Sequence, residues 1–177
     1  YAFVDFLEAA GQKLWQILPL GQTSYGDSPY QSFSTFAGNP YFISLEALIE
    51  EGVLTEKECD GADFGSDATS IDYGKMYEAR YVVLRKAFER SHVEKDADYV
   101  KFCEENSFWL DDYALYMAVK ADHDAKCWSE WEDDIRLRKP GAMERYREKL
   151  AKDIAFYQYL QYQFSRQWGQ LKDYANA

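Results

Sequence analysis

The sequence predicts an α/β fold, and two neighbouring features near its start support this class. The segment Tyr1–Ala10 carries apolar residues at helical spacing on one face, and Gly11 is placed to end that helix. The segment Gln12–Leu20 follows, with the apolar, partly alternating character of a buried strand that Pro19 stops. A helix, a glycine and a buried strand in this order are typical of α/β proteins.

The strand predicted at Gln12–Leu20 has no obvious partner in the rest of the sequence. A single strand cannot satisfy its own backbone groups, because each of its edges needs hydrogen-bond partners. We therefore expect the neighbouring strands to come from segments that these 177 residues do not contain. The start of the sequence points the same way, since it opens with Tyr1 inside a helical pattern that no capping residue precedes.

The segment from Gly21 to Pro40 is predicted to be a long loop that follows the strand directly. It is rich in glycine, serine, proline, asparagine and aromatic residues, and it has no helical period. Long ordered loops are often functional, and in barrel proteins the loops after the strands build the active site. We therefore expect this loop to carry binding residues.

Beyond Pro40 the pattern is mainly helical. Ser44 is a candidate cap for a short helix, and Thr55 with Glu58 forms a candidate capping box. The final segment places apolar residues every three or four positions from Leu150 to Leu171, and Trp168 belongs to that face. After a loop at residues 59–70, helices are expected at residues 73–90, 98–103, 108–120 and 142–174.

The composition limits the classes of partner. The formal net charge is −11, so phosphate backbones and anionic lipid surfaces repel the chain, and we expect neither nucleic acid nor membrane as a partner. A neutral substrate is compatible with this charge, although acidity also serves solubility alone. Aromatic residues make up 18 % of the chain, which suits both a core and a flat binding surface.

The cysteines and histidines suggest neither a disulfide framework nor a metal site. Cys59, Cys103 and Cys127 are odd in number and far apart, which favours free thiols in a cytosolic protein. His123 lies between Asp122 and Asp124, but such a run is more typical of a solvated turn than of a metal cluster. We expect no metal and no cofactor.

The loop combines the residue types that bind sugars. Tyr25 and Tyr30 flank a tight turn that contains Asp27 and Ser28. A pyranose has an apolar C–H face and a rim of hydroxyls, so a tyrosine ring stacks on the face while a carboxylate or hydroxyl bonds the rim. The alternative is an aromatic-rich turn that only packs.

Acidic and aromatic pairs elsewhere are weaker candidates. The neighbouring acids Asp111 and Asp112 do not face each other on a helix, and we expect them to bond locally near a helix start. The acidic pairs at 104–105 and 133–134 are also sequence neighbours, so they are not expected to face each other as a catalytic pair. For Trp128 and Trp131 we favour packing over a sugar platform.

A series of motifs resembles one enzyme family over nearly the whole chain. The segments 15–21, 25–32 and 36–40 closely resemble the 4-α-glucanotransferases, which are the amylomaltases, called disproportionating enzymes in plants. The resemblance continues in order through residues 72–74, 109–115 and 161–168. The run Tyr-Gly-Asp-Ser-Pro-Tyr-Gln at 25–31 is its most specific motif. The sequence departs at 22–24, where Gln-Thr-Ser stands in place of the more usual Pro-Thr-Gly and could alter the rigidity of the loop.

The resemblance implies part of an α-amylase-type (β/α)8 TIM barrel with a large, mostly helical insertion subdomain. Residues 1–40 would supply an early barrel helix, strand and active-site loop, and residues 41–177 the insertion that leads back to the barrel. The family cleaves α-1,4-glucan, holds a covalent glycosyl-enzyme and passes the sugar to a new 4-hydroxyl acceptor, glucose or a maltooligosaccharide. This retaining chemistry needs two carboxyl groups, which the family places on later strands, outside this chain.

The resemblance also assigns roles to individual residues. Tyr30 matches a tyrosine that stacks on the sugar at the cleavage point. Tyr25 and Tyr73 match positions linked to a second glucan site, and Asp27 and Ser28 lie within the matched run. For Tyr73 the alternative is packing on a helix face with Tyr77 and Tyr81, at four-residue spacing.

Three functions remain open at this point. The chain is expected to be the N-terminal part of a cytoplasmic 4-α-glucanotransferase, inactive without the C-terminal remainder of the enzyme. Its alternatives are a glucan-binding module without chemistry and a helical interaction domain whose aromatic loop only packs.

Overall fold

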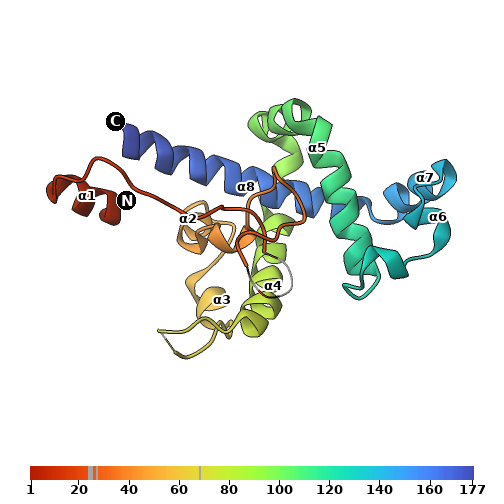
Figure 1. Ribbon diagram of the computed structural model, residues 1–177, viewed down its shortest axis with the longest axis horizontal. Helices are drawn as coiled ribbons and strands as arrows, with labels where there is room; N and C mark the ends of the chain where they lie inside the picture. Colours follow the sequence, from red (N-terminus) through yellow and green to blue (C-terminus); the bar gives the residue numbers. More distant parts are fainter. Residues whose placement is uncertain (24–25, 27, 68) are drawn as a thin grey trace.

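The chain is mostly helical in the computed structural model, which describes residues 1–23, 26, 28–67 and 69–177 (Figure 1). No strand forms within the described residues, so the predicted α/β class is not seen in this chain. The elements in chain order are α1 (Ala2–Ala9), η1 (Pro40–Phe42), α2 (Leu45–Glu50), α3 (Glu56–Asp60), α4 (Tyr73–Ser91), η2 (Val93–Lys95), α5 (Ala97–Asp122), η3 (Trp128–Glu130), α6 (Asp133–Arg136), α7 (Pro140–Lys149) and α8 (Ala151–Asn176).

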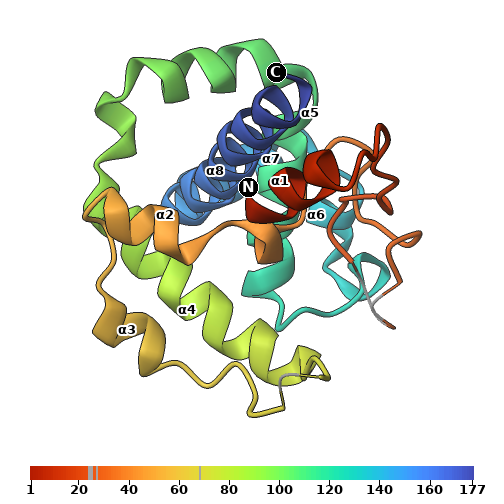
Figure 2. The ribbon, with the colours of Figure 1, turned by 90° about the vertical axis from the view of Figure 1, so that its left-hand side faces the viewer.

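Helix α8 is the centre of the fold. Figure 2 shows it running through the middle of the molecule, with α4 on one side and α5 on the other, and α5 packs against it most extensively. The first half of the apolar stripe predicted for the final helix faces this core, where Leu150, Tyr157 and Leu160 are buried, whereas Phe164, Trp168 and Leu171 are only half-buried. Phe88 of α4 lies against both Phe156 and Tyr159, at ring-centroid distances of 5.7 and 5.5 Å. Burial of each such side chain contributes about 1.5–3 kcal/mol to stability.

The local signals for helix ends are confirmed. Ser44 Oγ accepts a hydrogen bond from the Ala47 N–H at the start of α2, at 3.1 Å. Thr55 and Glu58 form the predicted capping box at the start of α3. Gly11 follows α1 with a φ of 71°, in the left-handed region where glycine is favoured.

The Glu58 carboxylate makes α3 sensitive to acid. Arg90 donates two hydrogen bonds to it, both at 2.7 Å, and these bonds, with one from Thr55, lower the pKa of Glu58 from its ordinary value of 4.5 to about 2. A carboxyl group whose pKa is lower in the folded state than in the unfolded state stabilises the fold at pH values above the unfolded-state pKa. This contribution is lost as the pH falls through the folded-state pKa.

We therefore predict a steeper loss of stability between pH 4.5 and pH 2 in the native chain than in Glu58→Gln, because the glutamine has no carboxyl group to protonate at this position. Thermal unfolding midpoints measured across this range give the comparison. Glu56→Gln, on the same helix, is the matched control and should retain the native slope. Parallel curves for the native chain and Glu58→Gln would contradict the prediction.

Two of the expected helix boundaries are wrong. Residues 98–103 and 108–120 belong to one helix, α5, which changes direction along its length (Figure 2). Between them Asn106 Nδ2 donates to the Phe102 carbonyl at 2.8 Å, so the polar side chain bonds to the preceding turn without ending the helix. The expected helix at 142–174 is divided at Leu150, whose buried side chain keeps the apolar period intact across the junction of α7 and α8.

The strand expected at Gln12–Leu20 is the main correction. Within the described part of the chain this segment forms no strand, and its apolar side chains are exposed, Leu14 at 91 % and Leu18 at 58 %. The Leu20 carbonyl accepts a hydrogen bond from the Asn39 N–H at 2.8 Å, where the segment reaches the helical body. The physical reason is that a strand forms only beside another strand, and no other strand forms among the described residues.

The termini lie side by side (Figures 1 and 2). The Tyr1 ring meets the Tyr174 ring of α8 edge-on at 4.9 Å, and the Tyr174 hydroxyl donates to Asp5 of α1 at 2.5 Å. In the part of the chain that the structure describes, no helix combines the length and apolar character needed to cross a membrane.

Candidate functional site

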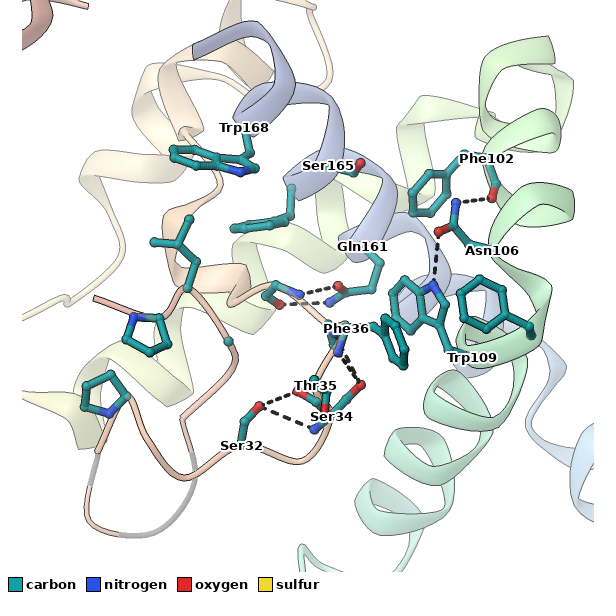
Figure 3. Close-up of a pocket in the computed structure, with 18 of the residues that line it drawn as sticks. Ser32, Ser34, Thr35, Phe36, Phe102, Asn106, Trp109, Gln161, Ser165 and Trp168 are labelled. Atoms are coloured by element: carbon teal, nitrogen blue, oxygen red, sulfur yellow. Dashed lines mark hydrogen bonds between the residues drawn. The ribbon is translucent and has the colours of Figure 1, made fainter. Parts of the chain in front are cut away.

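A cleft of about 640 Å³ lies between the loop after residue 18, the middle of α5 and the C-terminal half of α8 (Figure 3). We call it the aromatic cleft. Its volume falls in the range of small-molecule sites. Aromatic rings dominate its walls, contributed by Tyr30, Phe36, Phe102, Phe108, Trp109, Phe164 and Trp168.

Three rings from the loop and α5 form one wall of the aromatic cleft. Phe36 stacks on Trp109 with an interplanar angle of 21° and a centroid distance of 5.9 Å. Phe108 meets Phe36 edge-on at 5.4 Å and is 73 % exposed. The Trp109 indole N–H donates to Asn106 Oδ1 at 3.0 Å, which fixes the orientation of the ring. The wall is therefore a preformed aromatic surface with an open face.

The loop that carries Phe36 is braced by its own hydroxyls. Ser32 Oγ donates to the Ser34 carbonyl at 2.8 Å, and Ser34 Oγ accepts from the N–H groups of Phe36 and Ala37 at 3.1 and 3.3 Å. Figure 3 shows these bonds as dashed lines around Ser32 and Ser34. Such side-chain bonds to the backbone hold a turn without regular secondary structure.

The end of the loop is attached to α8 through Gly38. Its N–H donates to Gln161 Oε1 at 2.8 Å, and its carbonyl accepts from Gln161 Nε2 at 3.0 Å (Figure 3). Phe164 lies so close that a Cβ on Gly38 would be 2.0 Å from its ring. Only glycine permits this approach of the loop to the helix.

The structure places Tyr30 at the mouth of the aromatic cleft. Its side chain is 74 % exposed, so an open ring stands where the sequence suggests a sugar-stacking tyrosine. The Tyr30 N–H donates to Ser28 Oγ at 3.3 Å, which brings these two site candidates together. Tyr25 and Asp27, the other two candidates in the loop, lie outside the described residues.

Tyr73 lies at a different cleft. This second hollow, of about 880 Å³, is lined by residues 15–21, by the start of α4 and by the end of α8, and we call it the apolar cleft. Tyr73 begins α4 and is 38 % exposed. Tyr77 and Tyr81 form a ring pair at 5.3 Å, whereas Tyr73 forms no ring pair within the described residues. Phe164 and Trp168 line both clefts. Trp168 is therefore half-buried between the two clefts and does not lie in the core.

The described lining of the aromatic cleft contains no carboxylate, imidazole or thiol. The acidic pairs lie elsewhere and are held by other groups. Asp112 pairs with Arg138 and Asp134 pairs with Arg145, both at 2.7 Å. The expectation that Asp111 and Asp112 lie near a helix start is wrong, because α5 continues through them and Asp111 accepts from Gln158 of α8 at 3.3 Å.

Trp128 and Trp131 differ in their surroundings. Trp131 is buried against Tyr116 and His123, with ring centroids 5.4 and 5.3 Å away, while Trp128 is 53 % exposed. Burial alone would lower the pKa of His123, but its hydrogen bonds to Glu132 and to the Val119 carbonyl, both 2.7 Å, outweigh burial and raise it. Among the residues described, no group of three or more histidine, cysteine or acidic side chains could hold a metal ion.

Residue patterns could not have revealed the wall made by Phe36, Phe108 and Trp109. Phe36 and Trp109 each lie in a segment that resembles the enzyme family, but they are more than seventy positions apart. Their contact depends on how α5 crosses α8, and no local pattern encodes that crossing.

Comparison with known proteins gives a consistent set of similarities. A family model described as 4-alpha-glucanotransferase matches residues 1–177. The 4-alpha-glucanotransferase of Clostridium butyricum is 50 % identical over 176 residues, which are 99 % of this chain and 36 % of that protein. The protein of the same name from Thermus thermophilus is 42 % identical, over 99 % of this chain and 35 % of its own length.

Similarity extends to solved structures. The amylomaltase from Streptococcus agalactiae, in complex with acarbose, has a TM-score of 0.93 and 42 % identity. The match covers 99 % of this chain and 36 % of that one. The chain thus spans about a third of the length of the relatives that it matches.

Proposed function

The chain belongs to the 4-α-glucanotransferase family, and from this premise we propose that it is part of an enzyme that transfers segments of α-1,4-glucan to a new 4-hydroxyl acceptor. The acceptor is glucose or a maltooligosaccharide. The observation that carries the proposal is the exposed Tyr30 ring above an aromatic cleft that is rich in hydroxyls and free of carboxylates in its described lining. Such a surface suits a neutral sugar, which offers apolar faces and a hydroxyl rim.

The reaction is a retaining transfer. One carboxylate attacks the anomeric carbon while a carboxylic acid protonates the leaving oxygen. The conjugate base of that acid then takes the proton of the acceptor hydroxyl, whose oxygen attacks the anomeric carbon and releases the first carboxylate from the covalent glycosyl intermediate. The two groups must stand roughly 5 Å apart on either side of the scissile bond. The ion-paired acids of this chain do not meet that need, so we assign both catalytic groups to the remainder of the enzyme, and the chain is inactive alone.

This chain then supplies binding residues. Tyr30 stacks on the sugar at the cleavage point, while Ser28 and Asp27 bond its hydroxyl rim. Tyr25 and Tyr73 hold a second stretch of glucan beside the active cleft. The exposure of Tyr30 and Tyr73, on two adjacent clefts that share Phe164 and Trp168, supports this division of roles.

The exposed apolar segment Gln12–Leu20 fits the remainder of a (β/α)8 barrel. We propose that residues 1–40 contribute an early barrel helix, strand and loop, and that residues 41–177 form a helical insertion subdomain. The side chains of Leu14 and Leu18 would then be covered by neighbouring strands and helices of the C-terminal part. The acidic charge and the free cysteines Cys59, Cys103 and Cys127 suit a cytoplasmic enzyme that needs no cofactor.

A glucan-binding module without chemistry is the second candidate, favoured by a preformed cleft that lacks described carboxylates. Titration of this chain with maltoheptaose should then produce a saturable change in tryptophan fluorescence, because Trp109 and Trp168 line the cleft. Trp109→Phe should reduce the change and Tyr30→Ala should weaken the affinity.

Trp128→Phe is the matched control for this titration, since Trp128 is exposed but lies outside both clefts. It should retain the saturable part of the signal. A folded chain with no saturable response would contradict the module, and an unchanged affinity in Tyr30→Ala would remove Tyr30 from the site.

A further inference from the structure

Gln22 is a buried amide at the point where the loop that carries Tyr30 begins. Gln22 is 7 % exposed, although residues 12–19 of the preceding segment are exposed. Gln22 Nε2 donates to the Tyr81 hydroxyl of α4 at 3.0 Å, and Gln22 Oε1 accepts from the Tyr113 hydroxyl of α5 at 2.5 Å. One side chain thus joins the start of the loop to two helices.

The far end of the same loop reaches the same hydroxyl. Gln161 of α8 holds both backbone groups of Gly38, and its Nε2 also lies 3.4 Å from the Tyr113 hydroxyl. Gly21 and Gly38 form an isolated antiparallel bridge between the two ends. Gln22, Tyr81, Tyr113 and Gln161, which we call the amide network, therefore close the base of the loop.

The chemistry of the amide network favours a single arrangement. Burial raises the pKa of Tyr81 and of Tyr113, so both hydroxyls keep their protons at neutral pH. A buried amide without partners is costly, so Gln22 is held where both of its polar atoms are bonded. An apolar side chain of the same length would fill the space without fixing its direction.

We propose that Gln22 is a positioning residue for the transfer reaction: through Tyr81 and Tyr113 it fixes the base of the loop and thereby holds Tyr30 over the aromatic cleft. This inference rests on the proposed function. Gln22 does not line the aromatic cleft, so it acts through Tyr30 and makes no contact with the sugar there.

The test is a double-mutant cycle in the complete enzyme, with maltotriose as substrate. Gln22→Met keeps the length of the side chain and removes both hydrogen bonds, and it should lower kcat/KM about tenfold. The double variant with Tyr30→Ala should lose little more activity than Tyr30→Ala alone. Once the Tyr30 ring has been removed, losing the residue that positions it has no further effect on kcat/KM. Tyr81→Phe and Tyr113→Phe should lower kcat/KM in the same direction.

Gln163→Met is the matched control. Gln163 is another buried glutamine, 3 % exposed, but its Oε1 accepts from Arg166 at 2.6 Å, and among the described residues it makes no hydrogen bond to the loop. It should leave kcat/KM unchanged. If Gln22→Met fails to fold, Tyr81→Phe takes its place in the cycle.

The outcomes separate the two proposals. A native enzyme with no transfer from maltotriose overturns the proposed function itself. A native enzyme that is active, with losses from Gln22→Met and Tyr30→Ala that multiply, overturns the positioning role and leaves only a general effect on stability. Active native enzyme with a non-additive cycle supports it.

Discussion

Tyr30→Ala in the complete enzyme is expected to lower the rate of glucan transfer about 10- to 100-fold while leaving the thermal stability nearly unchanged. The factor corresponds to an aromatic contact of about 1.4–2.8 kcal/mol at the reacting sugar. Stability should be spared because the ring is 74 % exposed, and substitutions at exposed positions usually change the free energy of unfolding by less than about 0.5 kcal/mol.

Steady-state kinetics with maltotriose and a thermal unfolding curve measure the two halves of this result. Tyr30→Phe should keep most of the activity, since stacking needs the ring and not the hydroxyl. Trp128→Ala removes another exposed aromatic side chain outside both clefts and should leave the transfer rate unchanged. A normal rate with a large fall in Tm for Tyr30→Ala would place Tyr30 in the packing of the fold and not in the site.

Gly38→Ala is expected to destabilise the fold by about 1–3 kcal/mol, the usual cost of forcing an extra group into a packed region. The new Cβ would lie 2.0 Å from Cδ1 of Phe164 and 2.1 Å from Cε1, so the ring or the loop must move. Movement of the loop would also strain the two hydrogen bonds between Gly38 and Gln161. In a chain of this size, Tm should fall by roughly 2–4 °C for each kcal/mol.

Gly169→Ala is the matched control for this substitution. Gly169 lies in α8, where an added Cβ would meet no atom within 4 Å. Alanine is a better helix former than glycine by about 1 kcal/mol, so this variant should be as stable as the native chain or more stable. Equal thermal midpoints for Gly38→Ala and the native chain would show that Phe164 yields without cost, contrary to the close packing described above.

The sequence predicted those parts of the fold that depend on neighbouring residues. Ser44, Thr55 and Glu58 act within one helical turn, so their capping roles could be read from a few positions. The strand at Gln12–Leu20 shows the opposite case. Its apolar pattern is local, but a strand exists only beside a partner, and the described residues offer it none. Because no partner strand covers it, most of this segment is exposed.

The candidate site shows the same difference between local features, which the sequence predicts, and long-range contacts, which it does not. Tyr30 could be chosen from the loop because its neighbours and the family resemblance marked it; its ring is exposed, and its role in sugar binding stays a prediction. The stacking of Phe36 on Trp109 could not be predicted, since it depends on the crossing of α5 and α8. Gln22 stood out only as a departure from the family pattern, and its bonds to Tyr81 and Tyr113 join segments more than fifty positions apart.

The central proposal is that this chain binds glucan as part of a transferase whose catalytic carboxylates do not lie among these 177 residues. The most direct test is a maltotriose disproportionation assay on the purified chain, with its mass and helical circular dichroism checked and a complete 4-α-glucanotransferase as the positive control. We predict no glucose release and no longer products from the folded chain. Clear disproportionation would contradict the account, because carboxylates within this chain would then carry out the chemistry.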